Sequence, residues 1–235
     1  MENVVIGKVI GVRILQRLSR INVLDIPKII YINFRTLPFK KAVKFPIYIS
    51  YKIKIGKVYK NVIDIEGNIK PFMIRFGFPG SNGVIEKKNG WISFGRESKI
   101  KFKGKASFAC GCSIRVDSGI LEIGENFCAN KNCFISCNKS IKIGKDVLLG
   151  WDIGIRDSDG HYIVTNGNKG KNVKGVTIGN HVWICSYVNI LKGTIIGSDS
   201  VISYNSCVIG EFKESNLLIG GYPAKILKNE IDWEQ

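Results

Sequence analysis

Histidine is scarce in this sequence: only His161 and His181 occur among its 235 residues. Two histidines are too few for a zinc site that takes three histidine ligands from one chain. Acidic residues are also few, with 19 Asp and Glu against 35 Lys and Arg, which gives a formal net charge of +16. No apolar run of about 18 residues occurs, so no membrane-spanning helix is expected.

Two common nucleotide-binding motifs are missing as well. The sequence has no G-x-x-x-x-G-K-[ST] phosphate loop, and no glycine-rich Rossmann turn follows a strand pattern. Its seven cysteines are an odd number at irregular spacings, which argues against a disulfide framework or a zinc site and predicts a reducing cytoplasm. Lys8 and Arg13 interrupt the apolar stretch that follows Met1-Glu2-Asn3, so a signal peptide is not expected.

The positive charge is concentrated in the first quarter of the chain. Residues 1–60 hold 13 Lys and Arg against Glu2 and Asp25, a net charge of +11. A basic segment mixed with Ile, Phe and Tyr predicts contact with an anionic surface; membrane lipid, an acidic glycan, nucleic acid and an ordinary solvated surface are the alternatives. Nucleic acid is the weakest of them, because no recognisable RNA- or DNA-binding module accompanies the charge.

What the sequence does contain is a six-residue repeat from about Val176 to Gly210. An aliphatic residue recurs at every sixth position: Ile178, Ile184, Ile190, Ile196, Ile202 and Val208. A small or β-branched residue follows four positions after each of the first five: Val182, Val188, Thr194, Ser200 and Ser206. Such short units cannot bury an apolar side alone and must stack on their neighbours. Six residues suit one flat face, and three faces predict one coil of a triangular prism of parallel strands.

The same period occurs less regularly upstream. It runs through Ile123 to Ile141, slips by two residues and resumes at Ile143, whereas residues 92–123 alternate in the manner of imperfect early coils. A β-sandwich is disfavoured because its strands alternate with period two and are broken by turns every 8–12 residues or so. A helix is disfavoured because Val, Ile, Thr and Gly dominate and no apolar stripe at 3.6-residue spacing appears.

Two regions leave the repeat. Ile178 lies 23 positions after Ile155, which is not a multiple of six, so a polar, glycine-rich loop is expected to leave the prism near residues 157–175. Residues 1–80 lack the ladder and are expected to form short helices and strands that cap the prism, with a helix start or a turn at Asp25-Ile-Pro27. The predicted organisation is a basic cap or extension over 1–80, a repeat domain over 81–227 and a C-terminal tail over 228–235.

The repeat carries a family resemblance. The stretch VTIGNHVWICSYVNILKGTIIGSDSVIS, followed by GGYPAKIL, resembles the hexapeptide-repeat acyltransferases, and the likeness covers roughly residues 92–227. The loop sequence RDSDGH resembles the sugar O-acetyltransferases of bacterial capsule and lipopolysaccharide synthesis, and INFRTLPFKKAVKFPIYI resembles their N-terminal extension. The resemblance implies an all-β, left-handed parallel β-helix, an exception to the right-handed crossover rule. It also implies acetyl-CoA as co-substrate, no metal, and a homotrimer with active sites between subunits.

Acetyl transfer to a hydroxyl needs a base, which a neutral imidazole within hydrogen-bond reach can supply. His161 lies in the expected loop, where the family has its catalytic histidine, so it is the predicted base; an ordinary surface histidine is the alternative. Asp157 and Asp159 are the candidates for holding its tautomer, with capping of the loop as their alternative role. His181 is expected to point outward from a face.

The resemblance also assigns residues that bind the donor. Trp183 is expected to stack on a sugar ring or on adenine, with packing at the trimer interface as the alternative. Positions that match the family's contacts to the pantetheine arm are Ser186, Gly193, Thr194 and Ser203. Lys225 matches a lysine that meets a CoA phosphate. Cys185 departs from the family, in which glycine commonly follows the ladder residue.

The sequence thus predicts a cytoplasmic O-acetyltransferase that moves an acetyl group from acetyl-CoA to a hydroxyl of a bacterial surface glycan or its precursor. The acceptor is expected to be carbohydrate, with acidic and lipid-linked forms as the candidates. Residues 1–60 predict peripheral contact with the inner face of the membrane. The alternatives are N-acylation of an amino-sugar nucleotide and a non-catalytic glycan-binding trimer.

Overall fold

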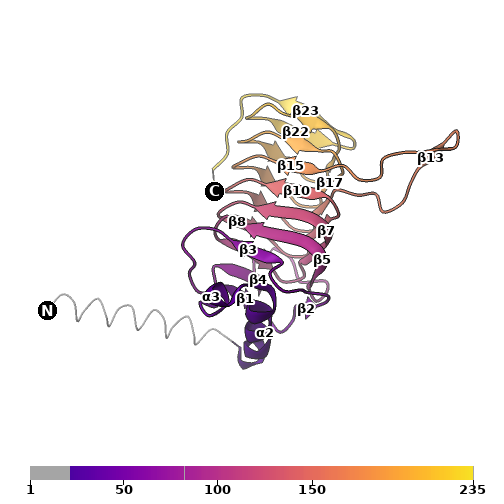
Figure 1. Cartoon of the computed structure of the whole chain (residues 1–235). Coiled ribbons are helices and arrows are strands. Elements are labelled where there is room, and N and C mark those ends of the chain that lie inside the picture. Colours follow the sequence, from indigo (N-terminus) through magenta and orange to yellow (C-terminus); the bar gives the residue numbers. More distant parts are fainter. Residues whose placement is uncertain (1–21, 82, 235) are drawn as a thin grey trace.

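The computed structural model describes residues 22–81 and 83–234, and its parallel strands are stacked in one column (Figure 1). The strands lie in three rows. The first row is β1 (Ile47–Ile49), β4 (Ile74–Phe78), β6 (Ala106–Ala109), β8 (Phe127–Ala129), β11 (Leu148–Leu149), β16 (Trp183–Ile184), β19 (Val201–Ile202) and β22 (Leu218–Gly221). At its end, β23 (Ala224–Lys228) pairs antiparallel with β22.

The other two rows share two long strands, β5 (Trp91–Phe102) and β7 (Ser113–Ile123), whose two halves lie in different rows. The second row contains their first halves with β2 (Lys54–Ile55), β9 (Phe134–Cys137), β12 (Gly154–Arg156), β17 (Asn189–Ile190) and β20 (Cys207–Val208). The third contains their second halves with β3 (Ile63–Ile65), β10 (Ser140–Ile143), β15 (Val176–Ile178), β18 (Ile195–Ile196) and β21 (Glu211–Phe212).

The register confirms that the sheet curls around one axis. In the regular region each residue pairs with one 18 positions further along: Ile178 with Ile196, Ile184 with Ile202, and Ile190 with Val208. Three six-residue faces therefore complete one circuit, as the repeat predicted. The predicted two-residue slip is present too, because Ile123 pairs with Ile143 at an offset of 20.

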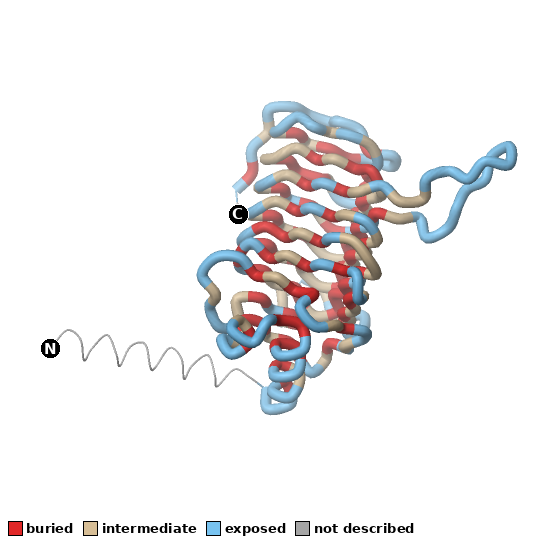
Figure 2. Tube along the Cα trace, in the orientation of Figure 1, coloured by how far each residue is buried: buried red, intermediate tan, exposed pale blue. Residues whose placement is uncertain are grey.

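The ladder residues form the core of the column, and Figure 2 shows buried residues recurring along each coil. All six rungs from Ile178 to Val208 are buried, and so are the small residues from Val182 to Ser206 that follow them. The lower coils are filled differently, by five buried phenylalanines: Phe76, Phe94, Phe102, Phe108 and Phe127. Phe76 and Phe108 stack with their ring centroids 5.0 Å apart. Large rings replace the aliphatic rungs here, and so the six-residue pattern is weak in this part of the sequence.

Helices cover the lower end of the column. η1 (Val23–Asp25) leads into α2 (Ile26–Thr36), which begins at the predicted Asp25-Ile-Pro27 signal, and α3 (Phe39–Ala42) follows. Asn33 ties α2 to the first strand, because its amide donates to the Ile47 carbonyl and accepts from the Ile47 N–H. Parallel pairing starts at β1, inside the range predicted as a cap. The first 21 residues of that range lie outside the described part of the chain.

No helix in the described residues is long and apolar enough to cross a bilayer. The longest of them, α2, has 11 residues.

A hairpin leaves the column where the sequence predicted a loop (Figure 1). Its arms contain β13 (Val164–Thr165) and β14 (Asn168–Lys169), which pair antiparallel. At the neck, Ser158 bridges Val173 and the Lys174 N–H donates to the Asp157 carbonyl. Ile143 pairs with Ile178 across this region, an offset of 35 against the usual 18, so the hairpin adds 17 residues to one coil.

Candidate functional site

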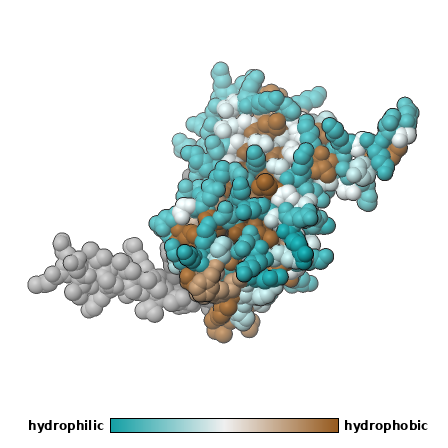
Figure 3. All heavy atoms as spheres, viewed as in Figure 1, coloured by the Kyte–Doolittle hydropathy of each residue, from teal (hydrophilic) through white to brown (hydrophobic). Residues whose placement is uncertain are grey.

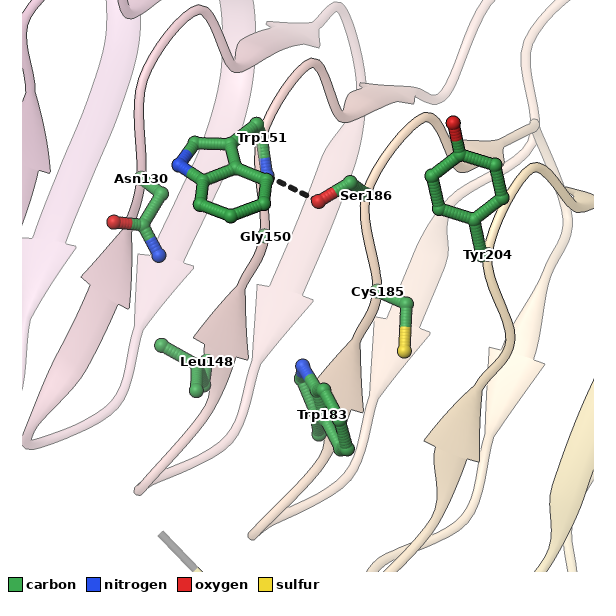
Figure 4. Close-up of a pocket in the computed structure, with 8 residues that line it drawn as sticks. All are labelled: Asn130, Leu148, Gly150, Trp151, Trp183, Cys185, Ser186 and Tyr204. Carbon is green, nitrogen blue, oxygen red and sulfur yellow. Dashed lines mark hydrogen bonds between the residues drawn. The ribbon is translucent and has the colours of Figure 1, made fainter. Parts of the chain in front are cut away.

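A groove of about 400 Å³ lies on the edge of the column that joins the first row to the second (Figure 4). Eight residues from successive coils line it: Asn130, Leu148, Gly150, Trp151, Trp183, Cys185, Ser186 and Tyr204. The wall is mainly apolar and aromatic, with a few polar groups among the rings. Small-molecule sites commonly have this composition, in which apolar surface gives affinity and a few polar groups give orientation.

Gly150 and Ser186 hold two neighbouring coils close together beneath the groove. The Trp151 N–H donates to the Ser186 hydroxyl at 3.0 Å. A Cβ on residue 150 would lie only 2.7 Å from that hydroxyl oxygen and 2.8 Å from the Ser186 nitrogen. Glycine is therefore required at position 150, and the Ser186 side chain serves the turn as well as the groove.

Trp151 is held by a strap, here meaning residues 79–81 and 83–89, that crosses the edge of the column. Its indole N–H donates to the Ser81 hydroxyl at 3.0 Å, and that hydroxyl donates to the Asn130 side-chain oxygen at 2.9 Å. Lys87, also in the strap, pairs with Asp152 at 2.8 Å. The strap thus fixes the ring that forms one wall of the groove.

Trp183 stands on β16 with 38% of its surface exposed. The C-terminal tail packs beside Trp183, since the ring centroids of Trp183 and Trp233 lie 6.0 Å apart. His181, expected to point outward, is about one-third exposed, and its Nδ1 lies 3.1 Å from Asp199 Oδ1. In the described residues no group of three His, Cys, Asp or Glu side chains is placed to hold a metal ion.

His161 lies in the exposed arm of the hairpin, away from the groove. The hairpin leaves the edge between the second and third rows, where Asp159 pairs with Lys192 at 2.6 Å. The groove lies on the edge between the first and second rows. One chain therefore does not bring the predicted base together with Trp183 and Ser186.

Asp157 is fully buried at the foot of the hairpin. Its two carboxylate oxygens accept backbone N–H bonds from Asn138, Lys139 and Ser140 at 2.7–2.8 Å. The Cys137 thiol is also directed at this carboxylate, at 3.6 Å. These bonds occupy both oxygens, so within the chain Asp157 anchors the hairpin and makes no contact with His161.

The residues matched to CoA contacts divide between two edges of the column. Ser203 is near Ser186 on the groove side, and Lys225 lies on β23 at the upper end. Gly193 and Thr194 lie on the hairpin's edge, where the Gly193 N–H donates to the Lys174 carbonyl. Thr194 is completely buried, and its hydroxyl donates to the Val208 carbonyl at 3.0 Å.

Sequence reasoning did not single out Asn130, Trp151 or Tyr204 for this site. The available signal was weak: Trp151 is a bulky aromatic directly after the glycine of a ladder rung. The strap left no periodic signal, because Ser81 and Trp151 are 70 positions apart.

The chain is similar to proteins of bacterial surface-glycan synthesis. It is 30% identical over 155 residues to a putative lipopolysaccharide biosynthesis O-acetyl transferase of Escherichia coli K12, covering 60% of this chain and 74% of the relative. It is 31% identical over 207 residues to an uncharacterized 24.8 kDa protein in the cps region of Klebsiella pneumoniae, covering 88% and 89%.

Among solved structures, the polySia-specific acetyltransferase NeuO matches 80% of this chain and 73% of its own, with 25% identity and a TM-score of 0.44. No family model matches the chain.

Proposed function

Because the chain belongs to the hexapeptide-repeat O-acetyltransferases of lipopolysaccharide and capsule synthesis, we propose that it moves an acetyl group from acetyl-CoA to a hydroxyl of a bacterial surface glycan or its precursor. The observation that carries this proposal is the similarity to the E. coli O-acetyl transferase over three-quarters of that protein's length. The protruding hairpin with His161 and the aromatic groove supply the groups that such a transfer needs.

The fold of this proposal is a left-handed parallel β-helix with a protruding loop and a capped lower end. The 18-residue register supports a coil of three six-residue faces. The hand of the coil follows from the family, in which it departs from the usual crossover rule.

The active site of the proposal is shared between chains in a homotrimer. Within one chain, His161 and the groove lie on different edges of the column, so a second copy is needed to bring a hairpin to a groove. Cyclic symmetry supplies this arrangement at every interface, because each chain then gives its hairpin to one neighbour and receives another at its groove.

In this site the imidazole of His161 takes the proton of the acceptor hydroxyl while the oxygen attacks the thioester carbonyl of acetyl-CoA. Backbone N–H groups of a coil turn stabilise the negative carbonyl oxygen of the tetrahedral intermediate. The intermediate then expels the CoA thiolate, which recovers the proton from the imidazolium. Asp157 and Asp159 act through the hairpin, because their contacts with residues 138–140 and with Lys192 fix its course.

The groove residues fit a CoA thioester and a sugar. Trp183 and Tyr204 in the groove offer ring faces for an adenine or a pyranose, and Ser186 offers a hydroxyl. Outside its lining, Ser203 offers a second hydroxyl and the exposed Lys225 can meet a phosphate. Gly193 and Thr194 would contribute through the chain that supplies His161, and Thr194 only through its backbone, because its side chain faces the core.

We propose that the protein acts in the cytoplasm. All seven cysteines are free in the structure, which is typical of proteins kept in a reducing compartment.

Release of the CoA thiol from acetyl-CoA, measured with and without a panel of bacterial glycans, tests the proposed function. His161→Ala should lower the acceptor-stimulated rate by roughly 10²-fold or more while CoA still binds, since general bases contribute about 10²–10⁴. Asn168→Ala, in the same hairpin, is the matched control and should keep the rate.

Three results would contradict the proposal. Full activity of the His161→Ala variant would remove the assigned base. Absence of acetyl-CoA binding in the wild type would favour a non-catalytic glycan-binding trimer, and transfer only to amino-sugar nucleotides would favour N-acylation.

A further inference from the structure

Helix α2 is apolar on two neighbouring faces. Ile29 and Ile32 on one face are buried against the column. On the other face Ile26, Ile30 and Phe34, spaced four residues apart, are each 40–47% exposed. The outer face of a helix that covers a domain is ordinarily polar, so this second stripe is not explained by the fold of the chain.

The stripe continues at both ends of the helix. Leu24 precedes it and is 61% exposed, and Phe39 of α3 follows it and is 72% exposed. The Phe34 and Phe39 rings are neighbours, with centroids 6.0 Å apart. We call Leu24, Ile26, Ile30, Tyr31, Phe34 and Phe39 the α2–α3 apolar surface. Figure 3 shows the brown patch at this lower end of the molecule. A contiguous exposed apolar patch usually marks an interaction site.

The segment that contains the α2–α3 apolar surface is positively charged. Residues 22–60 carry nine Lys and Arg against one acidic residue, Asp25. That carboxylate is buried, and it accepts hydrogen bonds from the Tyr48 hydroxyl and the Tyr51 N–H at 2.6 Å. Lys40 and Lys44, beside Phe39 in the sequence, are exposed.

We propose that the α2–α3 apolar surface seats the protein on an anionic lipid bilayer. Ile30, Phe34 and Phe39 enter the boundary between headgroups and acyl chains, and Lys40 and Lys44 meet the lipid phosphates. Apolar side chains flanked by lysines, with no exposed carboxylate in residues 22–60, are the pattern that binds such membranes in the plane of the interface.

This arrangement agrees with the proposed trimer. A threefold axis brings the three copies of the α2–α3 apolar surface to the same height on one face of the assembly. Three weak contacts made together bind far more tightly than one, because the second and third become intramolecular. The threefold arrangement rests on the proposed function, whereas the membrane contact itself does not.

The test is flotation of the full-length protein with phosphatidylcholine vesicles, with and without phosphatidylglycerol. Wild type should float only with the anionic vesicles, and less as salt is raised. Ile30→Ser/Phe34→Ser/Phe39→Ser should abolish flotation, and Lys40→Gln/Lys44→Gln should weaken it about tenfold or more. Ile120→Ser/Ile209→Ser, which removes exposed apolar side chains elsewhere, should float like wild type.

The thermal unfolding midpoint and acetyl transfer to a soluble acceptor, both expected unchanged, separate loss of binding from loss of folding or catalysis. The proposal is overturned if wild type does not float at low salt, or if the triple serine variant floats as wild type does. It is also overturned if the triple serine variant has half the particle mass of wild type in solution and neither protein floats. The surface would then join two copies of the protein.

Discussion

The indole of Trp233 lies flat on the imidazole of His181, with ring centroids 4.3 Å apart and 11° between the planes. The indole N–H also donates to the His181 carbonyl at 2.9 Å. The C-terminal tail is thus fastened to the coil that carries Trp183, beside the groove. Residues 228–235, predicted as a plain tail, contribute a buried ring to this edge of the column.

Trp233→Ala should therefore affect both stability and the groove. Loss of the stacked pair and of one hydrogen bond should lower the free energy of unfolding by about 1–3 kcal/mol. The KM of the substrate that contacts Trp183 should rise, because Trp183 loses its neighbour. Urea denaturation and steady-state kinetics for both substrates measure the two effects. Trp233→Phe keeps a ring and should recover part of each, and an unaltered KM for both substrates would refute the link to the groove.

Asp157 and Asp159 should differ sharply when each is changed to Asn. Asp157→Asn replaces a buried carboxylate that accepts three backbone N–H bonds, and charged hydrogen bonds contribute about 1.5–3 kcal/mol each. We expect a loss of at least about 2 kcal/mol in the free energy of unfolding. Asp159→Asn breaks only a partly exposed pair with Lys192 and should cost less than about 1 kcal/mol. Equal unfolding midpoints in urea for the two variants would show that Asp157 does not anchor the hairpin.

Thr194→Val separates a core role from a CoA-binding role. The valine keeps the shape of the side chain but removes the hydrogen bond to the Val208 carbonyl, which still accepts from the Leu191 N–H, so the cost should be about 0.5–1.5 kcal/mol. The KM for acetyl-CoA should stay the same, because the hydroxyl faces the core. A raised KM with unaltered stability would instead return Thr194 to the side-chain contacts of the donor.

The free energy of unfolding should fall at alkaline pH because of two thiols, the buried Cys137 and the half-buried Cys110. Burial raises the pKa of Cys137 to about 12, with the Asp157 charge adding to it, and burial with the Glu86 hydrogen bond raises that of Cys110 to about 11. A thiol whose pKa is raised in the folded state contributes its full stabilisation below the ordinary thiol value of 9.0. That contribution is lost as the pH rises toward 11–12.

Urea midpoints at two pH values, one below 9 and one between 9 and 11, measure this effect. The buried Cys137 thiol should lower the free energy of unfolding by up to about 1.4 kcal/mol per pH unit in that window, and the half-buried Cys110 thiol by less, because solvent screens its interactions. Lysines and tyrosines titrate in the same range, so Cys137→Ala is the reference. A loss of equal size in wild type and Cys137→Ala would exclude the Cys137 thiol as a source.

The column could be predicted from the sequence because each rung of a regular coil needs the same kind of residue, an aliphatic side chain that points inward. Ile184 and Ile202 are both inward residues of the first row, and their spacing alone reveals the 18-residue register. The position of the hairpin followed from the break in that spacing. In the lower coils Phe102 and Phe108 replace aliphatic rungs, which obscured the start of stacking at β1.

The groove was only half predictable, for a physical reason. The family resemblance pointed to Trp183 and Ser186, and both line the groove. The Trp151 wall depends on Ser81, and the tail contact depends on Trp233. Both are single long-range contacts that no local pattern encodes. The outer stripe of α2 was also hidden, because a helix that is apolar on both faces resembles a buried one until the neighbours of each face are known.

The neck of the hairpin has a consequence for how this protein can change over evolution. The Ser158–Val173 bridge and the Lys174–Asp157 hydrogen bond close the insertion on itself before the coil resumes. Residues between 159 and 172 can therefore lengthen, shorten or change sequence without shifting the register of any strand above or below. A change in this segment therefore alters what the hairpin presents to its surroundings while the coils of the column stay as they are.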